Sequence, residues 1–188
     1  MAPKETVFAR LRDGGAGHPV AIRLATPGDR AGVRQYFGAI SLRARYNRFL
    51  GAMGTLPEPV LAYFLQAARA DRLTILATTR CDGCEIVVGE ACYAFDAQAP
   101  RVEVALSVHD GWQGRGIGMA LLAQLETRAA ASGALCVFGD TLLSNDAVIG
   151  LARAAGYAPA GRPTDWGQLR FEKQVAAGPQ PASAAAGR

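Results

Sequence analysis

The spacing of hydrophobic residues divides the chain into short strands and helices. Apolar or alternating runs between glycine- and proline-rich turns predict strands, and apolar residues three or four positions apart predict helices. The predicted strands are residues 6–11, 19–24, 73–79, 85–95, 102–108, 135–139 and 167–173. The predicted helices are one that follows residues 27–29, one capped by Ser41, and residues 59–70, 116–131 and 147–155. Antiparallel strands come first and one strand–helix–strand unit follows, so the fold class is α/β (α+β) with a mixed sheet.

The segment after Ser41 is predicted to be a short amphipathic helix. Its apolar face is expected to carry Leu42, Tyr46, Phe49 and Leu50. Its arginines, Arg43, Arg45 and Arg48, fall outside that face. They form either an ordinary solvated surface or a docking site for an acidic protein surface.

Composition favours a single folded domain. The chain has 188 residues, of which 50% are hydrophobic and 19% charged, so it can build a core and is not wholly disordered. Residues 6–173 are expected to form the domain, residues 1–5 a loose N-terminus, and residues 174–188, rich in small residues and proline, a disordered tail. No apolar run is long enough to span a membrane, and the first residues lack the apolar core of a secretory signal, so we expect a cytoplasmic protein that does not bind membranes.

Neither charge nor cysteine content indicates a nucleic-acid or metal site. The net charge is +4, and no recognition-helix motif accompanies the arginines, so nucleic acid is not an expected partner. Of the four cysteines, Cys81 and Cys84 flank Asp82-Gly83, a dipeptide typical of tight hairpin turns. A zinc site needs about four ligands, and no second CxxC or histidine pair is present. No metal is therefore expected, and the cysteines are expected to be thiols.

The sequence of residues 102–122, VEVALSVHDGWQGRGIGMALL, carries the clearest chemical signal. A predicted strand leads directly into Gln113-Gly114-Arg115-Gly116-Ile117-Gly118, where a predicted helix begins. Glycines at a helix start allow close approach of a ligand, and the free N–H groups favour an anion such as a pyrophosphate. The spacing differs from the G-x-G-x-x-G dinucleotide fingerprint, and the Gly-Lys-Ser/Thr ending of NTPase loops is missing. The glycines alone are equally consistent with a simple tight turn.

The pattern Gln-x-x-Gly-x-Gly after Leu106-Ser107-Val108 resembles the acyl-CoA-binding motif of the GNAT superfamily of N-acetyltransferases. Ser144-Asn145 before a short helix that ends in Gly156-Tyr157 is similar to a later segment of that family. The resemblance covers about residues 6–173. It implies the GNAT fold, a central, mostly antiparallel mixed sheet flanked by helices, in which two parallel strands splay apart to admit acyl-CoA. Here those strands would be residues 102–108 and 135–139.

Upstream segments resemble the acetyltransferase domain of bacterial Pat-like protein lysine acetyltransferases, which modify acyl-CoA synthetases. These segments are LRDG, VAIRLATPGD and SLRARYNRF, the last at residues 41–49. The Pat-like enzymes often carry a fused regulatory or synthetase-like domain, and none is expected within these 188 residues. The resemblance therefore does not determine how this chain is regulated.

The resemblance also implies site residues. Acetyl-CoA would be held by Leu106, Ser107, Val108, Gln113, Gly114, Arg115, Gly116, Ile117, Gly118 and Asn145. Asn145 could equally cap the following helix. Glu103, the lone acid in an apolar strand, would accept the proton of the attacking amine, and burial would make it a better base. Glu90, His109 and Asp110 are the runners-up for that role. Ala152 stands where many family members have a tyrosine that protonates the leaving thiolate.

Three functions are compatible with these features. The first is direct acetyl transfer from acetyl-CoA to an amine of a protein lysine, with a lysine of an acyl-CoA synthetase as one acceptor. The second is acetylation of a small amine. The third is a non-catalytic acyl-CoA-binding module, against which Glu103 and the complete glycine motif argue.

Overall fold

One mixed sheet of eight strands, in the order β1-β2-β3-β4-β5-β6-β8-β7, forms the centre of the computed structural model. The structure describes residues 7–9, 19–66, 68–69, 71–164 and 166–175. All neighbouring strands are antiparallel except β5 and β6, which are parallel. The strands are β1 (Val7–Ala9), β2 (Val20–Leu24), β3 (Arg72–Cys81), β4 (Cys84–Phe95), β5 (Arg101–Val108), β6 (Cys136–Leu142), β7 (Ala158–Ala160) and β8 (Gln168–Gln174). The predicted mixed, mostly antiparallel sheet with one parallel pair is confirmed.

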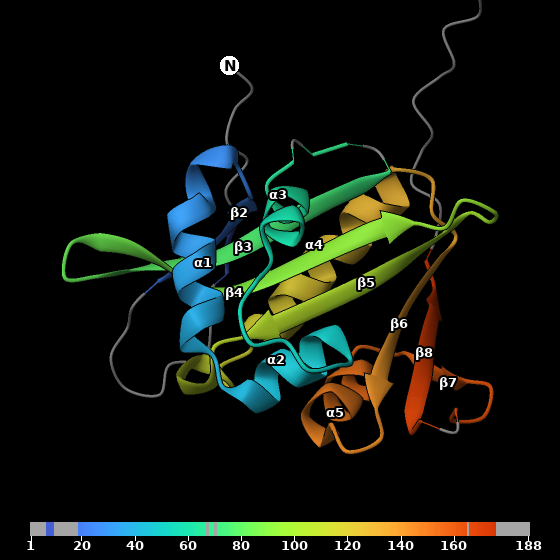
Figure 1. The fold of residues 1–188 in the computed structure, drawn as a ribbon. Coiled ribbons are helices and arrows are strands. Elements are labelled where there is room, and N and C mark those ends of the chain that lie inside the picture. The colour runs from blue at the N-terminus through green and yellow to red at the C-terminus, as the bar shows by residue number, and fades with distance from the viewer. Residues whose placement is uncertain (1–6, 10–18, 67, 70, 165, 176–188) are drawn as a thin grey trace, which may run out of the picture.

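Helices cover both faces of the sheet. Figure 1 shows α1 (Arg30–Ala39) and α3 (Glu58–Phe64) in front of the central strands and α4 (Ile117–Ala131) behind them. The short helices α2 (Leu42–Phe49) and α5 (Asp146–Ala154) lie next to each other near one end of the sheet (Figure 1). On the front face, Phe37 of α1 stacks on Phe64 of α3 with ring centroids 5.6 Å apart. Behind the sheet, Leu121 and Leu125 of α4 are fully buried. The sheet thus has an apolar core on each face.

Most predicted elements match the observed ones, but one strand was missed and several ends are displaced; β6, for example, runs to Leu142 rather than to residue 139. The third helix ends at Phe64 rather than at residue 70. Strand β7 was missed, because Pro159 interrupts its pattern and proline is tolerated only at a sheet edge, which β7 occupies. Gln174, assigned to the tail, ends β8, and the Val175 amide donates to the carbonyl of Leu135. The predicted loose N-terminus and the remaining tail, residues 176–188, lie outside the described residues.

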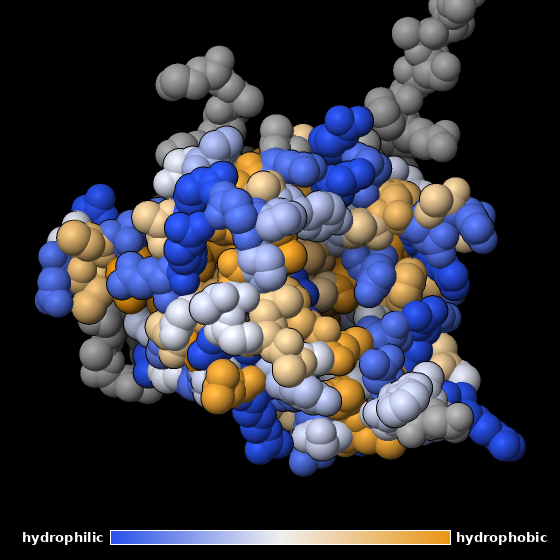
Figure 2. All heavy atoms as spheres, viewed as in Figure 1, coloured by the Kyte–Doolittle hydropathy of each residue, from blue (hydrophilic) through white to orange (hydrophobic). Residues whose placement is uncertain are grey.

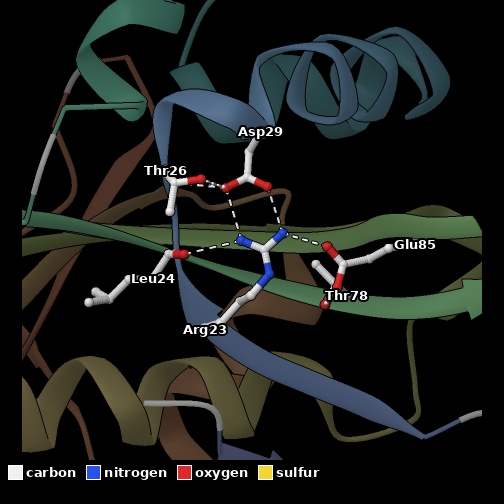
Figure 3. A network of polar contacts seen from close by, with 6 residues as sticks. All are labelled: Arg23, Leu24, Thr26, Asp29, Thr78 and Glu85. Atoms are coloured by element: carbon white, nitrogen blue, oxygen red, sulfur yellow. Dashed lines mark hydrogen bonds and ion pairs between the residues drawn. The ribbon is translucent and has the colours of Figure 1, made fainter. Parts of the chain in front are cut away.

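A hairpin and a buried ion pair fix the first half of the sheet. Asp82 and Gly83 form the turn between β3 and β4 with φ of 50° and 81°, as predicted. Figure 3 shows Arg23 of β2 in a two-point contact with Asp29, at 2.9 and 2.6 Å, and in contact with Glu85 of β4. Burial raises the pKa of Asp29, but hydrogen bonds from Arg23 and Thr26 outweigh it and lower the pKa below its ordinary value. This cluster sets where α1 begins relative to the sheet.

Candidate active site

A cavity of about 730 Å³ lies where β5 and β6 separate. Its wall is built from α2, β5, the glycine loop (residues 113–118), the first turn of α4, β6 and α5. Nine of the ten predicted acetyl-CoA-binding residues line it: Leu106, Ser107, Val108, Gln113, Gly114, Gly116, Ile117, Gly118 and Asn145. Segments more than 100 residues apart in the chain therefore meet in one site.

The glycine loop presents free backbone N–H groups to the cavity. Gly114 and Gly116 have φ of 72° and 84°, values that non-glycine residues rarely adopt. No side chain caps α4, and its first residue is Ile117. The first amides of a helix have no partner within it, and the helix dipole there attracts negative charge. The Gln113 side chain donates to the Val108 carbonyl at 3.0 Å, which ties the loop to the end of β5. This arrangement fits a pyrophosphate group.

Arg115 is the one predicted cofactor residue outside the cavity wall. Its guanidinium lies 4.7 Å from the ring centroid of Trp112 and donates to the Gly111 carbonyl at 3.0 Å. The side chain therefore braces the loop from outside. The expected contact with a cofactor is made by the backbone of this segment, and the role of Arg115 in it stays a prediction.

The splayed strands expected from the sequence are present. β5 and β6 pair only over residues 101–103 and 136–138. The next residue of β6 is Gly139, where an added Cβ would meet the Val104 carbonyl oxygen at 3.0 Å. Beyond this point β5 runs on to Val108 and β6 to Leu142 without pairing to each other. The gap opens a passage through the sheet, lined by Leu106 and Val108.

Asn145 caps α5 and also lines the cavity, so both interpretations of this residue are compatible with the structure. Its side-chain oxygen accepts from the Val148 amide at 3.5 Å, and 7% of the residue is exposed. Ala152 lines the cavity as well, with no group that could protonate a thiolate. Tyr157, also in the wall, is buried, and burial raises its pKa above the ordinary value.

Glu103 is exposed, which corrects the expectation that it is buried. It alternates with buried Val102 and Val104, so its side chain is on the opposite face of β5, the face of Ser107. It is outside the cavity wall and is the last residue of β5 paired with β6, opposite Phe138. Glu103 therefore lies at the edge of the gap and is accessible from solvent.

The runners-up for the base are already engaged in other contacts. Glu90 is 1% exposed, and Arg48 binds it at two points, 2.6 and 3.2 Å. Asp110 accepts two hydrogen bonds from Ser41 at the start of α2. His109 Nδ1 accepts from the Gly111 amide at 3.2 Å. All three act as structural anchors around the cavity.

The arginine-rich helix α2 differs from the prediction in two ways. Arg48 is buried with Glu90 rather than solvated, so it cannot dock an outside protein. On the face expected to be apolar and buried, Leu42 is 69% exposed and Tyr46 46% exposed. Figure 2 shows hydrophobic residues reaching the surface in the region of α2. Arg43 donates to the Ser144 carbonyl at 3.3 Å and lines the cavity, and Arg45 donates to the Gly54 carbonyl.

Sequence reasoning missed cavity residues on α2 and on the far part of β6. Asn47 of α2 lines the wall, and so do Asp140 and Thr141 of β6. Arg170 of β8 binds Asp140 at two points, 2.8 and 2.7 Å. The Thr141 hydroxyl is buried without a hydrogen-bond partner among the described residues. The strand pattern of β6 continues past Gly139 to Leu142, and this continuation could have revealed Asp140 and Thr141 from the sequence.

Comparisons with known proteins identify the family. A model of the acetyltransferase (GNAT) family matches residues 40–157. The chain belongs to this family. The GNAT domain of S. lividans PAT superposes with a TM-score of 0.80 at 25% identity, over 90% of this chain and 97% of that one. The acetyltransferase PA5475 of Pseudomonas aeruginosa is 26% identical over 153 residues, 81% of this chain and 82% of the relative. The yncA acetyltransferase of Salmonella typhimurium, solved with acetyl-CoA, has a TM-score of 0.62 at 19% identity, covering 89% of this chain and 98% of that one.

Family membership makes this GNAT chain an acetyl-CoA-dependent N-acetyltransferase. The residues present fit the cofactor: the loop offers amides for its pyrophosphate and the gap between β5 and β6 offers a path for its arm. Among the described residues, no group of three or more His, Cys, Asp or Glu side chains could hold a metal ion. Within the same residues, no helix has the length and apolarity needed to cross a bilayer.

Proposed function

We propose that this GNAT enzyme acetylates lysine side chains of a protein by direct attack on acetyl-CoA. The observation that carries the proposal is the single cavity bounded on one side by the glycine loop and on the other by α2. Helix α2 contains SLRARYNRF, the segment that resembles Pat-like enzymes, and the GNAT domain of S. lividans PAT is similar over nearly the whole chain. A lysine of an acyl-CoA synthetase is one acceptor consistent with this resemblance.

The cofactor would be held by the chain's backbone. The amides at the start of α4 would bind the pyrophosphate, and Leu106 and Val108 would flank the arm within the gap. When bound, acetyl-CoA supplies an acetyl group activated as a thioester. A thiol has a pKa near 8.5. Its thiolate can therefore leave without a general acid, which agrees with Ala152 at the position where many family members carry a tyrosine.

The acceptor must lose a proton before it attacks. A lysine with the ordinary pKa of about 10.4 is neutral in only about 1 molecule in 2,500 at pH 7. Glu103 is our candidate for the proton acceptor, directly or through a water molecule. Its exposure at the edge of the gap supports this role, because a lysine that enters from solvent can reach it. The neighbouring carboxylates Glu90 and Asp110 are occupied by Arg48 and Ser41.

A small amine is the alternative acceptor, because Asp146 in the cavity wall could attract a cationic molecule. The deciding experiment measures thiol release from acetyl-CoA with three sets of acceptors. These are blocked peptides with one lysine, a purified acyl-CoA synthetase, and small amines such as spermidine. We expect faster release with the protein or peptides. Release with small amines alone would favour the alternative, and no release with any acceptor would indicate a non-catalytic module. The expected cytoplasmic location stays a prediction.

A further inference from the structure

Helix α2 is attached to the rest of the enzyme mainly by polar contacts. None of its residues is fully buried, and Leu42 and Tyr46 face solvent. Its apolar packing is limited to partly buried side chains, Ala44 and Phe49, against the front core. In contrast, α1 buries Val33, Tyr36 and Phe37. Burial of apolar surface is what usually fixes a helix on a sheet, so α2 depends on other interactions for its position.

Those interactions are concentrated at its two ends. Ser41, at the N-terminus, is bound by Asp110, and Arg43 reaches the Ser144 carbonyl. Both of these contacts are exposed. The third, between Arg48 and Glu90, is buried, with side-chain exposures of 7% and 1%. A charge-assisted two-point contact away from water is much stronger than an exposed one.

The surroundings of Arg48 hold its guanidinium in one place. The Arg48 guanidinium carbon lies 5.2 Å from the ring centroid of Phe49 and 5.3 Å from that of Phe64. One Arg48 nitrogen also donates to the sulfur of Cys92 at 3.2 Å. The planar fork of arginine suits this position, whereas lysine would make only one point contact.

Glu90 extends the connection from α2 to the cavity strand β5. The Ser107 hydroxyl donates to Glu90 at 2.7 Å and lies 2.9 Å from the Tyr36 hydroxyl. Because the single Ser107 proton goes to Glu90, the Tyr36 hydroxyl is the donor to Ser107. Glu90 of β4 therefore links α2 with β5, two walls of the cavity, and through the Ser107 hydroxyl also with α1.

The face of α2 fixed in this way is a wall of the cavity. Arg43, Ala44 and Asn47 line it together with Arg48 itself. The glycine loop and the start of α4, which fit the pyrophosphate, form a different part of the wall. We propose that Arg48 is a positioning residue for the acceptor amine. Through its ion pair with Glu90, Arg48 sets the position of α2 and therefore the shape of the cavity wall that α2 forms. This inference rests on the proposed function as an amine acetyltransferase.

Four variants test the proposal. Arg48→Met removes the guanidinium group but leaves the buried Glu90 carboxylate without a positively charged partner, which can also destabilise the fold. Arg48→Met/Glu90→Leu replaces the pair by apolar groups, which is often tolerated, so a folded protein without the contact is obtained. Arg48→Lys keeps the charge but not the two-point geometry. Leu42→Ala is the matched control, because Leu42 is on the same helix but is 69% exposed and outside the cavity wall.

Three measurements are made on each variant. Hydrogen–deuterium exchange reports the attachment of α2, calorimetry reports acetyl-CoA affinity, and thiol release reports KM for a neutral blocked peptide with one lysine. For the double variant we expect at least fivefold faster exchange over residues 42–49, a KM for the peptide raised at least tenfold, and acetyl-CoA affinity within twofold. Arg48→Lys should fall between wild type and the double variant, and Leu42→Ala should match wild type.

Two results would overturn the proposal. One is unchanged exchange in α2 of the folded double variant, since α2 would then be held without Arg48. The other is an equal loss of affinity for peptide and acetyl-CoA, which would indicate a general structural role. If wild-type enzyme releases no thiol with any amine, the proposed function fails. The exchange measurement then decides separately whether Arg48 fixes α2.

Discussion

Asp110 and Ser41 join the glycine loop to the start of α2. One carboxylate oxygen of Asp110 accepts from the Ser41 amide at 2.8 Å, and the other accepts from the Ser41 hydroxyl at 2.7 Å. The same hydroxyl accepts from the Ala44 amide at 3.1 Å and so caps α2. Asp110 comes three residues before the loop, so the cofactor side and the acceptor side of the cavity share this contact.

Asp110→Asn should therefore weaken the attachment of α2. Asparagine has one side-chain oxygen, so only one of the two hydrogen bonds can be kept. We expect a loss of about 1–2 kcal/mol in the free energy of unfolding, as for a hydrogen bond to a charged group. The acceptor KM should rise about threefold to tenfold. Urea unfolding and thiol-release kinetics measure the two effects, and an acceptor KM equal to that of wild type would contradict the link to α2.

The same contact predicts a dependence of stability on pH. Partial burial raises the pKa of Asp110, but hydrogen bonds from Ser41 outweigh it, so the pKa lies below its ordinary value. A carboxylate with a lowered pKa stabilises the fold fully above its unfolded pKa of about 3.9, and this contribution is lost as the pH falls through the folded value. The stability difference between wild type and Asp110→Asn should therefore be constant at neutral pH and shrink below about pH 4. A difference that does not change between pH 6 and pH 3 would contradict this.

Local sequence rules predicted the conformation of the glycine loop well. The positive φ of Gly114 and Gly116 and the free start of α4 follow from glycine placement before a helix, which is visible within six residues. The Ser41 cap and the Asp82-Gly83 turn are equally local, and the structure contains both. These features depend only on residues that are close to one another in the sequence.

The acceptor half depended on long-range contacts and was predicted poorly. The partner of Arg48 is 42 positions away, so helical periodicity placed this arginine in solvent. The alternation in β5 separates Glu103 from Val102 and Val104, but it does not reveal what covers the Glu103 side. Only tertiary packing decides that, and it leaves Glu103 exposed.

Gly139 should be essential to the separation of β5 and β6. A Cβ at this position would lie 3.0 Å from the Val104 carbonyl oxygen, closer than in nearly all real contacts. Because backbone on both sides must shift, Gly139→Ala should cost about 1–3 kcal/mol of stability and weaken acetyl-CoA binding. The control is Gly38→Ala in α1, where an added Cβ meets nothing within 4 Å. That change should stabilise by about 0.5–1 kcal/mol. Thermal unfolding and calorimetry would compare the two, and equal stability of both variants would argue against this account.

The glycine loop can be tested at Gly116. Gly116→Asp adds both a side chain at a φ of 84° and a negative charge beside the proposed pyrophosphate site. We expect acetyl-CoA binding at least tenfold weaker, about 1.4 kcal/mol. Gly116→Ala separates the two effects, since it strains the backbone without adding charge and should weaken binding less. Unchanged affinity in folded Gly116→Asp, measured by calorimetry, would show that the cofactor's pyrophosphate binds elsewhere.

Glu103 provides the most direct test of the mechanism. Glu103→Gln keeps the size of the side chain but removes its ability to accept a proton. General-base catalysis typically contributes 10²- to 10⁴-fold, so kcat with a lysine acceptor should fall by about that much. Acetyl-CoA affinity should stay within twofold, because Glu103 is outside the cavity wall. A higher pH should partly restore the variant, since more of the amine is then neutral.

A matched control for this test lies across the sheet. Glu172 of β8 pairs with Phe138 on one side, as Glu103 of β5 does on the other. The gap between β5 and β6 opens on the Glu103 side, so Glu172→Gln should keep nearly normal kcat. If both variants lose activity equally, the carboxylates act through the local electrostatic field rather than through proton transfer. If Glu103→Gln keeps a normal kcat at pH 7, Glu103 is not the base, and a water molecule in the cavity becomes the next candidate.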